Sequence, residues 1–515
     1  MSNSNDNSVV ENTLIKRNII ANYAGSIWTA LMSLAFVPLY IHFMGMEAYG
    51  LVGFFAILLS IFALLDMGLS STLNREMARL SALTGNEKEM HNLVHTLGLI
   101  YWVMGGLIVI VVIALSAYIS ESWVKAENLP PATVKQAVML MGIAIGLQWP
   151  TSFYSGGLMG LQRQVLLNVV IVAMATLRGI GSIFILWLVS PTILAFFSWQ
   201  VFISGMQTAC MLISLWSSMP PSKEKTGFQF SSLLGIWRFA AGMFGISMLA
   251  TLLTQTDKII LSRMLTLEMF GYYSLAGLVS MSLYRFIMPL FTAVYPRLTQ
   301  LVAVNDQVAL KELYHRSCQM LSLVILPVAM VLVFFSKEIL FLWTQNSVTA
   351  NNTYQVMSLL VAGTALNSLM NLPYALQLAH GWTKLAFYVN MVSVILLVPM
   401  IFFMAKWYGA VGAAIVWVIL NSGYILICIP LMHRRLLPDE KWRWYWQDTG
   451  IPLVASISIA GVGRLLMFDQ LSQPFLLLFI IFITISTIFV TAIVIPTTRL
   501  YLFRSLRMVK LFENA

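Results

Sequence analysis

Long apolar runs separated by short polar connections dominate the chain. A helix that crosses a bilayer needs about 20 mostly apolar residues, and the pattern predicts fourteen of them. The connections, such as 337–354 and 433–448, are too short for a sizeable soluble domain. We place the helices near 18–43, 49–72, 92–118, 134–160, 165–189, 192–217, 235–261, 271–295, 316–336, 355–379, 385–405, 409–432, 449–468 and 475–496.

The composition supports this assignment. Hydrophobic residues make up 59% of the 515 positions and charged residues only 10%, whereas soluble domains hold about 45–50% and about 25%. This excludes a soluble enzyme, a disordered chain and a disulfide scaffold, and the runs are too long for the strands of an outer-membrane barrel. Backbone groups in lipid must be paired within their own segment, so we expect an all-α polytopic membrane protein.

Basic residues in the connections predict the orientation. Of 30 Lys and Arg residues, 20 fall on one side of the predicted spans and 6 on the other, and four lie within spans. Because cytoplasmic loops carry the excess of Lys and Arg, both termini are expected in the cytoplasm. The segment 441–446 alternates basic and aromatic residues, which favours an anchor at the inner headgroups over a nucleic-acid site, and we expect no nucleic-acid partner.

An internal repeat is visible in the sequence. Glu47 to Gly50 matches Glu268 to Gly271, and Arg163 matches Lys384 at the same offset. We therefore expect two parallel lobes of six helices related by a pseudo-two-fold axis, as in alternating-access transporters. The predicted domains are an N-lobe at 1–220, a C-lobe at 221–440, and two added helices with a cytoplasmic tail at 441–515.

Residues 18–80 carry a resemblance to a known family. The relevant positions are Asn22 and Gly25, then the runs 38–40, 44–45, 49–50, 64–69 and 74–78. They resemble the N-terminal signature of bacterial polysaccharide exporters of the O-antigen flippase type, often called Wzx. That family shares a superfamily with multidrug and toxin extrusion transporters and with the lipid II flippase.

The resemblance implies a function. Such proteins move an undecaprenyl-diphosphate-linked oligosaccharide, such as an O-antigen repeat unit, from the inner to the outer leaflet of the bacterial inner membrane. The expected partners are this glycan lipid, membrane lipids and other polysaccharide-assembly membrane proteins.

Charged residues within the predicted spans are candidates for the site, because a charge at a helix centre costs about 2.5–3.5 kcal/mol on insertion scales. Arg178 and Arg285 lie near the middle of their spans, Lys258 towards the outer end of its span, and Arg238 near an inner end. We expect these four cations to bind the diphosphate. The alternatives are internal ion pairs for Arg178 and Arg285, and a plain interfacial anchor for Arg238.

Two carboxyl groups within the spans are candidates for ion coupling. Asp66 stands in an apolar stretch with no cation three or four residues away, so it is a candidate for loading H⁺ or Na⁺. The alternative is a hydrogen bond to a helix N-terminus or a pair with Arg75. Asp257, next to Lys258, is assigned to the same coupling site or to an outer charge network.

No enzymatic activity, cofactor or metal is expected. His91 and His95 lack an HExxH pattern, and the chain has no Walker loop. The runner-up functions are a multidrug extrusion antiporter, whose cavity should be acidic where this one is net basic, and a membrane glycan polymerase or ligase, which would need larger outer loops.

Overall fold

The structure, a computed structural model, describes residues 2–82, 85–221, 227, 237–467 and 471–499. Every regular element in these ranges is a helix, and the β pairing within them is one isolated bridge between Lys125 and Thr266. The all-α prediction is confirmed. The chain divides into two compact units, Met1–Gly271 and Tyr272–Ala515.

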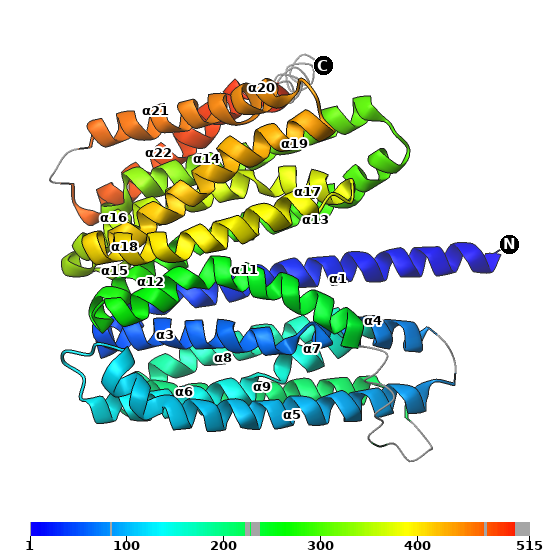
Figure 1. Cartoon of the computed structure of the whole chain (residues 1–515), viewed down its shortest axis with the longest axis vertical. Coiled ribbons are helices and arrows are strands. Elements are labelled where there is room, and N and C mark those ends of the chain that lie inside the picture. Colours follow the sequence, from blue (N-terminus) through cyan, green and yellow to red (C-terminus); the bar gives the residue numbers. More distant parts are fainter. Residues whose placement is uncertain (1, 83–84, 222–226, 228–236, 468–470, 500–515) are drawn as a thin grey trace, which may run out of the picture. The chain divides into compact units, whose positions relative to one another are not determined.

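The first unit contains both long and short helices. Its helix α6 packs against α5 and α9, α8 packs against α1 and α9, and α4 packs against α7 (Figure 1). The elements are α1 (Ser2–Ala35), α2 (Val37–Met44), α3 (Met46–Ala63), η1 (Leu64–Asp66), α4 (Leu69–Ser81), α5 (Glu87–Tyr118), η2 (Ile119–Trp123), α6 (Pro131–Gln148), α7 (Thr151–Gly160), α8 (Gln164–Leu188), α9 (Ile193–Ser218) and α11 (Trp237–Met264).

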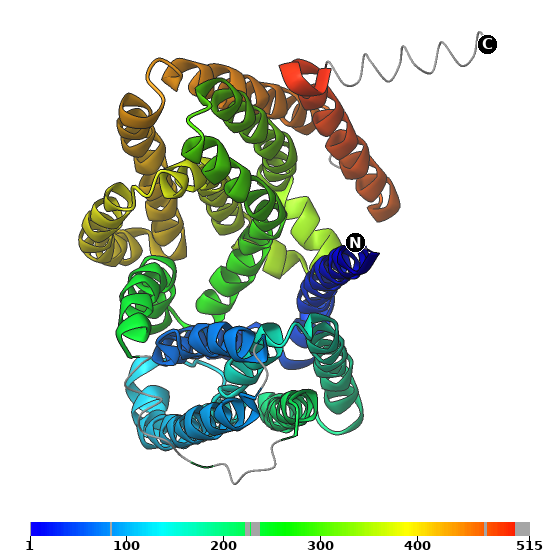
Figure 2. The same cartoon turned by 90° about the vertical axis from the view of Figure 1, so that its right-hand side faces the viewer.

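Helix α12 (Leu267–Ser282) leads into the second unit, where α14 packs against α13, α16, α21 and α22. Figure 2 shows the helices of each unit from a direction closer to their ends. The elements are α13 (Tyr284–Ala303), α14 (Gln307–Phe334), α15 (Ser336–Thr344), α16 (Ser347–Leu369), α17 (Asn371–Ala379), α18 (Lys384–Gly423), η3 (Tyr424–Cys428), α19 (Ile429–Leu436), α20 (Lys441–Arg443), η4 (Trp444–Gly450), α21 (Ile451–Leu465) and α22 (Gln473–Val494).

Ten helical segments among the described residues are long and apolar enough to cross a membrane. Their outer faces carry large exposed apolar side chains; on α22, for example, Phe475 and Phe482 are 66% and 65% exposed. A water-facing surface does not carry so many of these side chains. The chain is therefore a multi-pass membrane protein.

The ten segments relate simply to the fourteen predicted spans. Lys384–Leu436 contains two of them, because Gly409 at φ +58° and ψ −138° breaks the helix between them. The three predicted spans outside the ten correspond to α6 with α7, to α11 and to α21, all of which are helical. The number fourteen and the orientation stay predictions.

Helix boundaries repeat along the chain with constant spacing. The starts of α5 and α14, at Glu87 and Gln307, are as far apart in sequence as the starts of α8 and α18, at Gln164 and Lys384. The starts of α7 and α17, at Thr151 and Asn371, have the same separation. Each of these helices follows a break at the end of the preceding helix, α6 or α16. Two halves of unrelated origin would not share the same spacing of helix boundaries. The boundaries therefore support the duplication that a few matching residues predict. The predicted domain limits stay predictions.

The two copies of the repeated Gly motif contact each other within the first unit. A Cβ atom on Gly50 would lie 2.1 Å from the Leu267 carbonyl oxygen, and one on Gly271 would lie 2.7 Å from the Met46 carbonyl oxygen. Each helix start thus packs against the backbone of the other, and both positions require glycine because backbone atoms cannot yield as a flexible side chain does.

Candidate functional site

Asp66 lies where the second predicted span is interrupted. Helix α3 ends in the 3₁₀ turn η1, and Met67 and Gly68 follow with φ of +47° and +75° before α4 begins at Leu69. Positive φ values at two successive residues turn the chain and end the α-helical hydrogen bonding. The Asp66 carboxylate therefore lies at a helix break, close to the N-terminus of α4.

Hydroxyl groups from three helices surround this carboxylate. Ser70 on α4 donates to Oδ2 at 2.8 Å, Tyr101 on α5 donates to Oδ1, and Ser152 on α7 approaches Oδ1 at 3.4 Å. Arg75 contacts Glu76, at 2.8 Å. The Asp66–Arg75 pair considered as an alternative is not found among the described residues. We call Asp66 with Ser70, Tyr101 and Ser152 the Asp66 hydroxyl cluster.

Helix α11 packs against α3, η1 and α4, and so passes beside the Asp66 hydroxyl cluster. It carries Asp257 and Lys258, which are both half-buried. The Lys258 ammonium group donates within its own helix, to Gln255 Oε1 at 3.3 Å and to the Thr254 carbonyl at 3.4 Å. Both contacts are long, and both partners are neutral.

Arg178 occupies the middle of α8 and is held by amide oxygens from α9. Its Nη1 donates to Gln200 Oε1 at 2.6 Å, and its Nη2 donates to Gln207 Oε1 at 3.1 Å. Gln200 is itself oriented by a 3.2 Å hydrogen bond to Ser182. In the part of the chain that the structure describes, Arg178 forms no ion pair, so the internal salt bridge considered as an alternative is not found. Both partners are neutral amides, so they do not neutralise the positive charge of the guanidinium group.

Arg285 lies in the second unit, beside the break between α12 and α13, and its side chain is exposed. Its neighbour Tyr284 donates to Asn367 Oδ1 at 2.7 Å. The side chain of Arg238 lies outside the described residues. The structure thus places Arg178, Asp66, Asp257 and Lys258 in the first unit and Arg285 in the second. Their convergence on one cavity stays a prediction.

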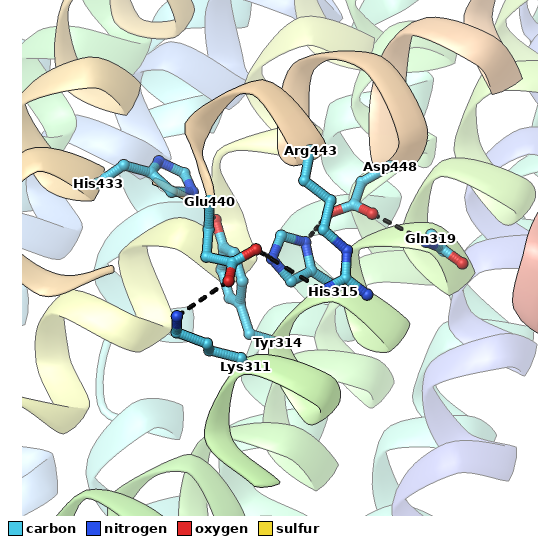
Figure 3. Close-up of polar contacts among 8 residues, drawn as sticks. All are labelled: Lys311, Tyr314, His315, Gln319, His433, Glu440, Arg443 and Asp448. Carbon is cyan, nitrogen blue, oxygen red and sulfur yellow. Dashed lines mark hydrogen bonds and ion pairs between the residues drawn. The ribbon is translucent and has the colours of Figure 1, made fainter. Parts of the chain in front are cut away.

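A polar cluster that the sequence analysis did not identify lies in the second unit (Figure 3). His315 on α14 faces two carboxylates, with Nδ1 on Asp448 and Nε2 3.1 Å from Glu440 Oε2. Gln319 donates to Asp448 Oδ1 at 2.9 Å, and Lys311 lies 3.0 Å from Glu440 Oε1. We call these five residues the His315 cluster. No sequence motif marks it, because its two carboxyl groups come more than a hundred positions after His315 in the chain.

The carboxyl groups of the cluster differ in their surroundings. Burial raises the pKa of Asp448, and the hydrogen bonds from His315 and Gln319 oppose this rise without cancelling it. Partial burial also acts to raise the pKa of Glu440, but the contacts with Lys311, His315 and Arg443 outweigh it and hold this pKa below its usual value. The more exposed carboxyl is thus kept ionised, while the buried one favours retention of a proton within the cluster.

A separate hollow of about 640 Å³ lies among Trp442, Arg443, Tyr445, Trp446 and Gln447. The Lys441 ammonium group lies 4.6 Å from the centre of the Trp442 ring, and Trp442 and Trp446 are mostly exposed. Aromatic rings interleaved with cations are typical of a membrane interface. None of the predicted site residues whose side chains the structure describes lines this hollow.

Comparison with known proteins places the chain in a family. Residues 15–302 match the family described as "Polysaccharide biosynthesis protein", and this stretch covers more than half of the 515 residues. The chain belongs to this polysaccharide biosynthesis family. The resemblance found at residues 18–80 is thereby confirmed. Residues 227–403 also match the MatE family.

One relative of the chain comes from Shigella flexneri and is provisionally named an O-antigen transporter. It is 22% identical over 298 residues, which cover 58% of this chain and 69% of that protein. Among solved structures, the lipid II flippase MurJ in an inward closed conformation matches with a TM-score of 0.65 at 15% identity, over 93% of this chain and 98% of its own. An inward-facing multidrug resistance MATE family transporter of the MOP superfamily matches with a TM-score of 0.61 at 13% identity, over 81% and 94%. These likenesses confirm the predicted transporter fold.

Proposed function

We propose that this chain flips an undecaprenyl-diphosphate-linked oligosaccharide across the bacterial inner membrane. The chain belongs to a polysaccharide biosynthesis family, its Shigella flexneri relative is named for O-antigen transport, and its fold resembles that of a lipid II flippase. Both termini would lie in the cytoplasm. The protein would act as a transporter and not as an enzyme, with the lipid-linked glycan, membrane lipids and other assembly proteins as partners.

The observation that carries the proposal is the state of Arg178. A cation in the middle of a membrane helix is costly unless it is solvated or paired, and the partners of this one are two neutral glutamines. Such an arginine is prepared for an anion, and a guanidinium matches a phosphate through two parallel hydrogen bonds. Lys258, whose contacts are long and neutral, would contribute a second positive charge to the diphosphate site. Arg285 and Arg238, the other two predicted cations, would contribute the remaining positive charges.

Coupling to an H⁺ or Na⁺ gradient would use the Asp66 hydroxyl cluster, together with Asp257 on the adjacent helix. Hydroxyl groups can either donate or accept. Ser70, Tyr101 and Ser152 can therefore satisfy Asp66 whether it is charged or neutral, without a movement of their helices. This tolerance suits a carboxyl group that loads and releases an ion in each cycle.

The test is a strain that lacks this chain, complemented with wild type, Arg178→Ala or Arg178→Lys at equal protein levels. Surface polysaccharide and accumulated lipid-linked intermediates are then quantified. The expected order of export is wild type, then Lys, then Ala, because Lys keeps the charge and loses the planar fork. Arg163→Ala, an exposed arginine at the start of the same helix, serves as the control and should export normally. Normal export by Arg178→Ala would overturn the proposed role of Arg178.

A second candidate function is multidrug extrusion, which the MatE match over residues 227–403 favours. The charges within the predicted spans argue against it. These spans contain four cations and two carboxyl groups, whereas a site for a cationic drug should contain more carboxyl groups than cations. An accumulation assay with a lipophilic cationic dye separates the two functions. Dye export by the wild type, lost in Asp66→Asn, would favour extrusion.

A further inference from the structure

The His315 cluster is built for a bound proton. The side chains of His315 and Asp448 are 1% and 0% exposed, and both ring nitrogens of His315 face carboxylate oxygens (Figure 3). An ionised carboxylate only accepts hydrogen bonds, and a neutral imidazole has one N–H. Both contacts can exist together only if the imidazole carries a second proton or one of the carboxyl groups is protonated.

The other contacts of the two carboxyl groups show where that proton is held. Asp448 Oδ1 accepts from Gln319, and Glu440 Oε1 accepts from Lys311. Arg443 Nη1 also lies 3.6 Å from Glu440 Oε2. All these partners are donors, so the proton lies between the ring and the carboxylates. Loss of the proton would set a lone pair of Nε2 against an oxygen of Glu440, and a buried polar contact of that kind is costly.

Charged and titratable groups approach His315 from several elements. Helix α14 itself provides Lys311, Tyr314 and Cys318, and α19 provides His433, whose Nε2 lies 3.4 Å from the Tyr314 hydroxyl. The charged groups Glu440, Lys441 and Arg443 come from the segment before η4, and Asp448 comes from η4 itself. Lys311, Glu440 and Arg443 are partly exposed, with side-chain exposures of 37%, 16% and 43%. Protons can therefore exchange with water at the Glu440 side, while the Asp448 side is closed.

The cluster joins segments that are far apart in the chain. It connects α14 to the segment that leads into α21, and Gln319 extends the connection because its Oε1 accepts from Thr497, just after α22, at 2.8 Å. Helices α21 and α22 also pack directly on α14. In Figure 1 these helices lie together among the green, orange and red elements of the second unit. The state of His315 thus bears on both helices of the C-terminal pair.

We propose that the His315 cluster is a proton-binding site that fastens α21 and α22 to α14, tightly when the proton is bound and loosely after it is lost. The ligand is the proton itself, and its release changes how firmly the C-terminal helix pair is held. The proposal does not depend on which substrate the protein carries.

Hydrogen exchange on the full-length protein in lipid nanodiscs tests it. Peptides that cover residues 437–467 are followed from about pH 5.5 to pH 8.5, after correction for the intrinsic pH dependence of exchange. Protection of this segment should fall roughly tenfold from the low end to the high end, the loss expected when a buried polar contact is left unsatisfied. A protection level that is the same throughout this range would overturn the proposal.

Two variants separate proton binding from a merely structural role. In Glu440→Gln, the new side chain can accept from or donate to Nε2, so the contact persists in both states of the ring. This variant should keep its protection and lose the pH dependence. In His315→Gln, protection should be low at every pH. His380→Gln is the control, because His380 bonds the Leu376 carbonyl of its own helix, and it should behave as wild type. A Glu440→Gln profile as steep as that of the wild type would reject the proton-binding site.

Discussion

The two units each hold a carboxyl group within a polar cluster, and the clusters differ in the kind of partner. Asp66 is surrounded by hydroxyl groups, which can donate or accept, whereas Asp448 and Glu440 face groups that only donate apart from the ring of His315. A carboxyl group among hydroxyls can change its charge while its neighbours rotate in place. A carboxyl group among groups that only donate cannot take up a proton without losing a hydrogen bond. The first arrangement suits ion loading, and the second suits a fastening between helices.

Removal of the buried carboxylate should have the largest effect on stability. Asp448→Ala leaves His315 and Gln319 without their acceptor in a fully buried position, and breaking a buried pair in this way costs about 3–5 kcal/mol. We expect a clear fall in the temperature of unfolding of the purified protein. Asp439→Asn changes an exposed carboxylate nearby, at a positive φ that Asn also adopts, and should leave that temperature unchanged. Equal behaviour of the two variants would show that the His315 cluster does not hold the unit together.

Acidification should weaken the same cluster through Glu440, with a smaller effect. The pKa of Glu440 is lower in the folded protein than its usual value. Its stabilising contribution is therefore fully present above the ordinary carboxyl pKa and is lost as the pH falls through the lowered value. Because this ion pair is partly exposed, we expect about 1 kcal/mol or less. The measurement is the unfolding temperature against pH, in which Glu440→Gln should lose part of the acid-side decline. If the unfolding temperature of this variant fell with acidification as steeply as that of the wild type, groups other than Glu440 would cause the acid destabilisation.

The smallest effect on stability should come from Asp66→Asn, although its effect on transport should be large. The hydroxyls of Ser70, Tyr101 and Ser152 can reorient towards an amide, so the change in stability should stay below about 1 kcal/mol. Export by this variant should no longer depend on the ion gradient at unchanged protein abundance. Asp257→Asn tests the second predicted coupling residue in parallel. Full gradient-dependent export by Asp66→Asn would show that the Asp66 hydroxyl cluster does not load the ion, and would contradict the functional difference between the two clusters.

Most of the fold follows from local sequence pattern. Apolar runs predict the helices, and a single repeat offset predicts repeated boundaries such as Glu87 and Gln307 to within one residue. The interruption at Asp66 was not predicted, because a 3₁₀ turn followed by a positive φ at Met67 leaves no break in hydropathy.

The candidate sites were predictable only in part. An isolated charge in an apolar run marks Arg178 and Asp66 without reference to any partner. Their partners, such as Gln200 and Tyr101, are ordinary polar residues whose role depends on packing. The His315 cluster lies beyond sequence reasoning altogether, because Asp448 is far from His315 in the chain and meets it only through the packing of the helices.

The central claim is tested most directly with purified protein in proteoliposomes that contain a fluorescent undecaprenyl-diphosphate oligosaccharide. A membrane-impermeant quencher or glycosidase reports how much of the lipid has changed leaflets. The account predicts that wild type and Arg163→Ala equilibrate the lipid between leaflets, that Arg178→Lys does so more slowly, and that Arg178→Ala does not exceed protein-free vesicles. Equal flipping by wild type and Arg178→Ala would contradict the proposed site. No flipping by the wild type in the presence of an imposed ion gradient would contradict the proposed function.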